Sequence, residues 1–236
     1  MPKEKTMQSE IGGYLSTLLR THFGKGPTSA YVTVARPFIA IHLRGFLAPT
    51  ERILVEQKQF KRVLETRDLL MNELKQEIKL NLWKIAELDA KEVYADWHLE
   101  QKTGMIIVVL NEEEEQENWQ WPEDIKEEEF YRQVKIGSIE AQKEPDETSI
   151  YWLNERTVLI RRFGILLQLE KELIKNGFEE QLKIAKRPVE YKIVAESNIQ
   201  PTLNRNILET FVDWNFETDI GYMVLILEPQ EKQQEQ

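Results

Sequence analysis

A glycine-rich loop offers the clearest hint of binding chemistry in this sequence. It runs from Gly24 to Ser29 and contains Lys25. A phosphate-binding loop places its lysine directly after the second glycine, between a strand and a helix. Here the lysine precedes the second glycine, and the flanking residues predict a helix before the loop and a strand after it. No helix N-terminus would then face a bound phosphate. The sequence favours an ordinary turn, and the remaining binding hypothesis is a small anion held by Lys25 and Arg44, with His22 as a third candidate.

Metal and catalytic chemistry has little support in the sequence. The three histidines, His22, His42 and His98, form no HExxH motif and no cluster with acidic residues at ligand spacing. The chain has no cysteine, which excludes thiolate metal sites and cysteine nucleophiles. No serine lies in a GxSxG turn. A histidine near a helix C-terminus, as expected for His22, is typical of dipole stabilisation. We therefore expect no enzyme activity, no metal and no cofactor.

An Asp-Trp pair occurs twice. Asp96 and Trp97 match Asp213 and Trp214 within a sixteen-residue segment that aligns without a gap. Such a repeat indicates two copies of one structural unit. A tryptophan on a strand buries a large apolar area, and an aspartate beside a hairpin loop accepts hydrogen bonds from backbone amides. We interpret the two pairs chiefly as a signature of the fold. The functional alternative is that the two hairpins are equivalent contact surfaces.

The net charge of −10 is concentrated in one short segment. Residues 112–129 hold ten acidic residues and one lysine, so the rest of the chain is nearly neutral. Charge therefore implies neither a nucleic acid nor an anionic membrane surface as a partner. The same segment contains Trp119 and Trp121. We expect them to dock on a neighbouring domain, and the alternative is a short motif that binds a partner.

The first copy predicts the order helix, strand, strand, helix, strand, strand. The expected segments are a helix at 11–23, a hairpin at 28–35 and 38–43, a helix at 49–86, and a hairpin at 91–99 and 104–110. The long helix is either continuous or made of two helices joined near Gln57–Gln59. Gly24 is placed to cap the first helix in a left-handed conformation, and Gly104 lies where the second hairpin needs a positive φ.

The second copy repeats this order in a diverged form. We expect Thr148 to parallel Thr28 and Phe178 to parallel Phe60. The first helix of this copy is expected to be short, around 130–136, and Pro188 is expected to break or restart the long helix. Residues 189–194 alternate like a strand, but the repeat favours a helix there.

These patterns predict an α+β fold made of two tandem repeats. Each repeat is expected to form a four-stranded antiparallel sheet covered by helices. The expected parts are a first repeat at 1–111, an acidic linker at 112–129, a second repeat at 130–228 and a disordered tail at 229–236. No stretch of eighteen apolar residues and no signal peptide is found in the sequence.

Three segments of the first copy form a recognisable pattern: His22 to Ser29, Leu43 to Glu51, and Asp96-Trp97 followed by Gly104. This pattern resembles the MpsC-like family of bacteria, whose members are small domains, some of them in tandem. The first copy matches the pattern well. The second copy matches it less well, because it lacks the Gly-Lys-Gly-Pro sequence of the loop, so a ligand that depends on this loop would bind the first copy alone.

The family takes its name from a sodium-translocating, membrane-potential-generating system. The resemblance therefore implies a soluble, non-catalytic accessory protein, cytoplasmic and peripheral at the membrane, whose partner is a membrane transport complex. A second hypothesis is a small-anion or metabolite-sensing module that uses Lys25 and Arg44. An enzyme whose site is invisible in sequence patterns is the third. A nucleic acid partner is not expected, and the oligomeric state stays open.

Overall fold

The chain folds into two compact units. A computed structural model describes residues 6–112 and 119–230. The first unit comprises Met1–Glu115 and the second Gln116–Gln236. Parts of the expected acidic linker (113–118) and tail (231–236) lie outside the described residues.

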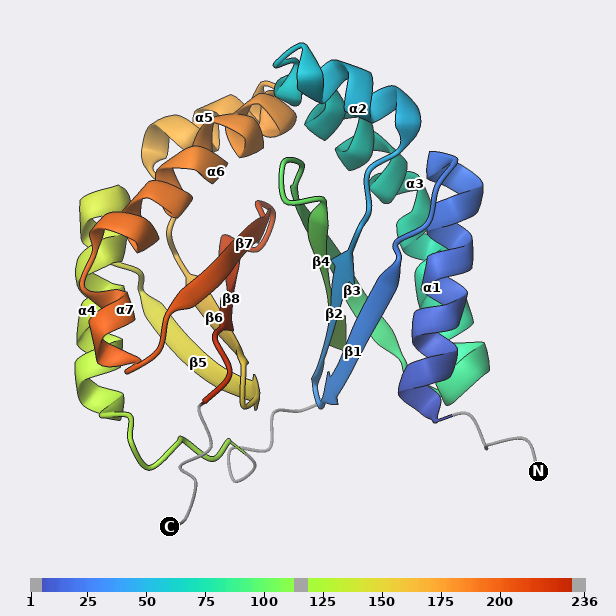
Figure 1. The fold of residues 1–236 in the computed structure, drawn as a ribbon. Helices are drawn as coiled ribbons and strands as arrows, with labels where there is room; N and C mark the ends of the chain where they lie inside the picture. The colour runs from blue at the N-terminus through green and yellow to red at the C-terminus, as the bar shows by residue number, and fades with distance from the viewer. Residues whose placement is uncertain (1–5, 113–118, 231–236) are drawn as a thin grey trace. The chain divides into compact units, whose positions relative to one another are not determined.

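The first unit contains three helices and four strands among its described residues. In chain order they are α1 (Met7–Phe23), β1 (Ser29–Ala35), β2 (Phe38–Arg44), α2 (Pro49–Glu56), α3 (Phe60–Ala86), β3 (Ala90–His98) and β4 (Thr103–Leu110). The strands form one antiparallel sheet in the order β1-β2-β4-β3. Helices α1 and α3 cover one face of it (Figure 1). The predicted α+β fold, with a four-stranded antiparallel sheet under helices, is confirmed.

Alternation along the strands builds the core on the helix-covered face. Ile39, Ile41 and Leu43 point to the same side of β2 because side chains alternate along a strand, and all three are fully buried. They pack with the apolar stripe of α1, which includes Leu15 and Leu19. As predicted, α1 ends at a glycine in the left-handed conformation, with φ of 75° at Gly24.

The long helical segment of the first unit is divided. Helix α2 ends at Glu56 and α3 begins at Phe60, so of the two alternatives the structure has two helices joined near Gln57–Gln59. Lys58 has a φ of 57°, and the N–H of Gln59 donates to the carbonyl of Leu54 at 2.8 Å. These local bonds end α2 and redirect the chain into α3.

The second unit repeats the same architecture. Its elements are α4 (Glu127–Ala141), β5 (Glu147–Asn154), β6 (Thr157–Phe163), α5 (Gln168–Lys175), α6 (Glu179–Glu196), the short α7 (Ile199–Thr202), β7 (Ile207–Asn215) and β8 (Ile220–Leu227). The sheet order β5-β6-β8-β7 mirrors that of the first unit. Helix α4 begins at Glu127, within the segment expected to be the acidic linker.

Two expectations about helices of the second unit were wrong. Helix α4 has 15 residues, whereas a short helix around 130–136 was expected. Helix α6 continues through Pro188 without a break. Pro188 lies on the exposed side of α6, while the buried side carries Leu182 and Val194. Tertiary packing on both sides of the proline thus holds a helix that the local sequence disfavours. The helical prediction for residues 189–194 is confirmed.

The alignment between the two units needed correction at the loop before the first hairpin. In the first unit, the N–H of Thr28 donates to the carbonyl of Arg44 at 2.8 Å; in the second, the N–H of Asp146 donates to that of Phe163 at 2.9 Å. Asp146, and not Thr148, therefore takes the place of Thr28. The second unit does have this loop, with Lys143 and Pro145 in place of Lys25 and Pro27.

A second equivalence was shifted by one residue. Helices α2 and α5 have eight residues each, and α3 and α6 follow them after the same interval. Phe178 therefore precedes its helix, as Gln59 does, while Phe60 corresponds to Glu179. Both alignments were hidden in the sequence, because other residues replace the glycines of the loop and the phenylalanine that begins α3.

The two tryptophans of the acidic segment dock on the second unit, as expected. The ring centroid of Trp119 lies 4.9 Å from that of Tyr151. Trp121 lies 5.8 Å from Phe130 and 5.9 Å from Trp152. These aromatic contacts tie the end of the segment to the core of the second unit.

Candidate functional site

The three residues predicted to hold an anion lie on the surface of the first unit with different neighbours. Nε2 of His22 lies 3.9 Å from a carboxylate oxygen of Glu77. The guanidinium of Arg44 lies 5.4 Å from the ring centroid of Tyr31. Lys25 is exposed in the loop after α1. Within the described residues, no hydrogen bond or ion pair joins these three side chains to one another. The anion site therefore stays a prediction.

The two Asp-Trp pairs have the same local geometry. The N–H of Trp97 donates to Oδ1 of Asp96 at 2.9 Å, and the N–H of Trp214 donates to Oδ1 of Asp213 at 2.9 Å. Both indoles belong to the cores of their units. Because neighbouring residues on a strand point to opposite faces, each aspartate lies on the other face of its sheet. The aspartate thus fixes the backbone beside a core tryptophan.

Gly104 serves this tryptophan rather than the hairpin turn. The expected positive φ was wrong: it occurs at Lys102, with φ of 57°, and Gly104 lies inside β4 directly opposite Trp97. A Cβ at Gly104 would lie 2.3 Å from Cε3 of Trp97. The glycine is needed because the indole occupies the space above it.

A buried ion pair beneath Trp97 was missed by the sequence analysis. Arg67 of α3 is 0% exposed. Its Nε and Nη2 donate to the two carboxylate oxygens of Glu51 at 2.8 and 2.6 Å. The guanidinium lies 4.5 Å from the ring centroid of Phe46 and 4.8 Å from that of Trp97. Oε2 of Glu51 also accepts the N–H of Ala48 at 2.8 Å. The pair joins α2 to α3 and is covered by the rings of Phe46 and Trp97.

The second unit contains the same arrangement with a lysine. Nζ of Lys186 lies 2.8 Å from Oε1 of Glu170 and 5.8 Å from the ring centroid of Trp214. Nζ also donates to the side-chain oxygen of Gln142 at 2.5 Å. In both units the carboxylate and the cation are sixteen residues apart. This repeated spacing, with a tryptophan that follows it, is the sequence signal that could have revealed both pairs.

The buried pairs are suited to holding helices together rather than to chemistry on a ligand. Arg67 is closed off from solvent by protein. Lys186 is 4% exposed, and burial lowers its pKa although Glu170 acts in the opposite direction. A cation that is enclosed by its own fold cannot meet a substrate. We therefore assign both pairs to the architecture of the units.

Besides its bond to the backbone of Trp214, Asp213 has two cationic neighbours, Lys183 and Arg187. Its carboxylate accepts from Nζ of Lys183 at 2.6 Å. Burial opposes ionisation, but the charges of Lys183 and Arg187 outweigh it and hold the pKa of Asp213 below its ordinary value of 3.8. The ionised aspartate is thus part of the folded second unit.

This lowered pKa predicts an acid-sensitive contribution to stability. A carboxyl whose pKa is depressed in the folded state stabilises the fold above its unfolded pKa, and this stabilisation is lost as the pH falls through the folded pKa. Between pH 6 and pH 2, Asp213→Asn should therefore lose less unfolding free energy than the wild type, with the difference arising below about pH 4. Urea unfolding at a series of pH values measures it. The exposed Glu155→Gln is the control, and parallel curves for Asp213→Asn and the wild type would contradict the assignment.

Two further features, a metal-binding cluster and a membrane-spanning helix, are absent from the described part of the chain. No group of three or more histidine or acidic residues there is arranged to hold a metal ion. None of the helices in residues 6–112 and 119–230 is both long enough and apolar enough to cross a bilayer.

Comparison with known proteins places part of the chain in a family. Residues 3–112 match the family described as "MpsC: Na+-translocating membrane potential-generating system (MpsC)". No curated protein and no solved structure matches the chain. The matched segment contains the loop at Lys25, Glu51 with Arg67, and the Asp96-Trp97 pair. The first unit of this chain therefore belongs to the MpsC family.

Proposed function

We propose that the chain is a non-catalytic accessory protein of a Na+-translocating, membrane-potential-generating system. The family match over residues 3–112 carries this proposal. We further propose that the second unit is a diverged MpsC domain in tandem, because its sheet order and buried ion pair repeat those of the first. The protein would act in the cytoplasm, peripherally at the membrane, and bind a membrane transport complex.

The internal use of charged side chains supports a binding role over a catalytic one. Arg67 and Lys186 are buried beside aromatic rings, and each is paired with a carboxylate of its own unit. Asp96 and Asp213 hold backbone amides. All of these groups are used inside the fold of their own unit.

The alternative function, a small-anion or metabolite sensor, has less support. It rests on Lys25 and Arg44, which are both exposed. Arg44 packs against Tyr31, and the loop is closed by the N–H and hydroxyl of Thr28, which both donate to the carbonyl of Arg44. These contacts stabilise the loop without a ligand.

Site-specific photocrosslinking in native cells tests the proposal. A photoreactive residue would replace Tyr31 in the first unit or Leu169 in the second, which are 55% and 72% exposed. We expect a crosslinked adduct that fractionates with membranes and contains an integral membrane protein. Ile78, which is 0% exposed, provides the matched position that should give no adduct. If neither position gives an adduct in the membrane fraction, with the protein at its natural abundance, the proposal is refuted.

A further inference from the structure

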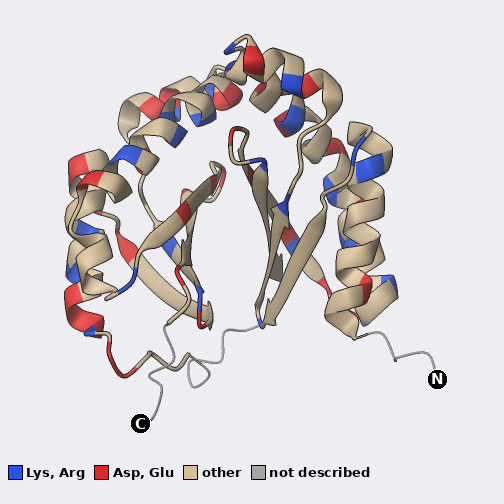
Figure 2. Cartoon of the chain, viewed as in Figure 1, with Lys and Arg blue, Asp and Glu red and all other residues tan. Residues whose placement is uncertain are grey.

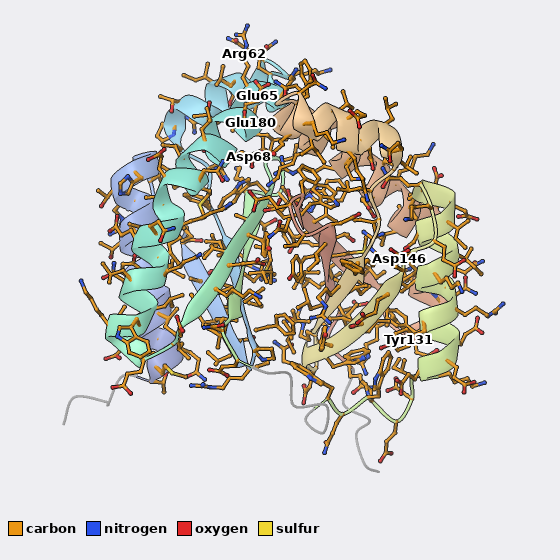
Figure 3. The ribbon with its side chains drawn as sticks, turned by 180° about the vertical axis from the view of Figure 1, so that it is seen from behind. Arg62, Glu65, Asp68, Tyr131, Asp146 and Glu180 are labelled. Atoms are coloured by element: carbon orange, nitrogen blue, oxygen red, sulfur yellow. The ribbon has the colours of Figure 1, made fainter. Side chains whose placement is uncertain are left out.

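The second unit has an open groove between α4 and the start of β5. Its volume is about 720 Å³. Tyr131 from α4 and Asp146 from the segment before β5 are both labelled in Figure 3 and line the two walls. The complete lining is Glu127, Glu128, Tyr131, Arg132, Lys135, Glu144, Pro145, Asp146, Glu147 and Thr148.

A tyrosine of this groove takes the place of a glycine of the first unit. The buried residues Phe130 and Val134 of α4 follow the spacing of Ile11 and Leu15 in α1, so Tyr131 takes the place of Gly12. At Gly12 a Cβ would lie 3.4 Å from a methyl group of Val32, which is ordinary contact, whereas a tyrosine ring would need more space between α1 and β1.

Tyr131 stands between α4 and β5 instead. Its hydroxyl accepts the N–H of Ile150 at 3.2 Å, and its ring is half-buried. Burial raises the pKa of Tyr131, so the phenol is neutral at physiological pH. The tyrosine holds the helix away from the strand and forms an aromatic wall in the space that results.

The groove has also gained acidic residues. Five carboxylates line it against two cations, Arg132 and Lys135. The residues of the first unit equivalent to these acidic residues are uncharged: Gln8 for Glu127, Ser9 for Glu128, Gly26 for Glu144, Thr28 for Asp146 and Ser29 for Glu147. Figure 2 shows acidic residues at the start of α4.

Internal pairing neutralises only part of this charge. Lys135 pairs with Glu144 at 2.6 Å, Lys143 lies 3.7 Å from Asp146, and Arg161 lies 3.6 Å from Glu147. Acidic residues in the first turn of a helix stabilise its dipole, which accounts for Glu127 and Glu128. The acidic residues on the opposite wall precede or begin a strand, and each of them has a cation of the same unit as a partner.

We propose that this groove binds a Lys/Arg-rich segment of a partner protein. Excess carboxylates complement such a segment, and the ring of Tyr131 offers a face for a cationic side chain. Short cytoplasmic loops of membrane proteins carry an excess of lysine and arginine, so the inference rests on the proposed function and deepens it. The second unit would supply the contact that the first unit lacks, because the loop of the first unit has no acidic residue.

The test uses the full chain and a fluorescein-labelled octa-arginine peptide, with fluorescence anisotropy at two salt concentrations. The groove variant combines Glu144→Gly, Asp146→Thr and Glu147→Ser, which restore the residues of the first unit. The control variant combines Glu113→Gln, Glu114→Gln and Glu115→Gln, which remove the same charge from the acidic segment. Circular dichroism and the unfolding midpoint verify that each variant is folded.

We expect the groove variant to bind roughly tenfold more weakly than the wild type, because three surface pairs are lost, and the control to stay within about twofold of it. Equal weakening in both variants, or no binding by the wild type, would overturn the proposal. Peptide binding without membrane adducts in the photocrosslinking experiment would refute the proposed function alone. Membrane adducts without peptide binding would refute the groove alone.

Discussion

Glu51→Ala is expected to destabilise the first unit by about 3–5 kcal/mol. The substitution leaves the guanidinium of Arg67 buried without its carboxylate, and an uncompensated buried charge costs about this much. Arginine cannot escape the penalty by losing its proton. The capping bond from the N–H of Ala48 to Glu51 is lost as well. Chemical unfolding followed by tryptophan fluorescence measures the change.

The matched controls separate burial of charge from loss of contacts. Glu56→Ala removes an exposed partner of Arg52 and should cost less than about 0.5 kcal/mol. The double variant Glu51→Leu with Arg67→Met replaces the pair by apolar groups and should recover most of the lost stability. A double variant as unstable as Glu51→Ala would show that the charge is not the cause.

The second unit provides an internal comparison. Glu170→Ala removes the partner of Lys186, whose pKa is already lowered by burial. A lysine can become neutral where an arginine cannot, so Glu170→Ala should cost less than Glu51→Ala. Similar losses in both units would contradict this account of the two cations.

Much of the fold could be predicted because its signals are local or repeated. The alternation of β2 and the position of Gly24 follow from residue type alone. The paired Asp-Trp segments indicated two units. Pro188 misled because its effect on a helix is local, whereas α6 is held by packing from Leu182 to Val194. The loop of the second unit was missed because Gln142 and Glu144 replace the glycines that mark it in the first.

The buried pairs were harder to predict for a different reason. A charged residue on a helix usually lies in solvent, and nothing in the spacing around Arg67 or Lys186 distinguishes them from exposed neighbours. Only the comparison of the two copies does so, because the sixteen-residue separation and the following tryptophan recur. The acidic groove is likewise visible only after the loops are aligned by their hydrogen bonds, since sequence alone paired Thr28 with Thr148.

Gly104→Ala is expected to cost about 3 kcal/mol, near the upper end for overpacking. The new Cβ would lie 2.3 Å from Cε3 and 2.6 Å from Cζ3 of Trp97. The indole has little room to move, because Phe46 lies 5.5 Å away between ring centroids and Arg67 stacks on it. The strain must therefore be relieved by displacing the ring, the strand or the buried ion pair.

Gly221→Ala is the matched control in the second unit. There the new Cβ would lie 2.6 Å from Cδ1 of Ile165 and 3.1 Å from Cδ1 of Trp214. Cδ1 of isoleucine is the end of a flexible side chain and can rotate away, so the cost should be about 1 kcal/mol. Unfolding free energies measure both variants, and near-ultraviolet circular dichroism should report a changed tryptophan environment for Gly104→Ala. If Gly221→Ala proved the more damaging, the tryptophan of the first unit would be less tightly held than the aromatic contacts and the buried Arg67 imply.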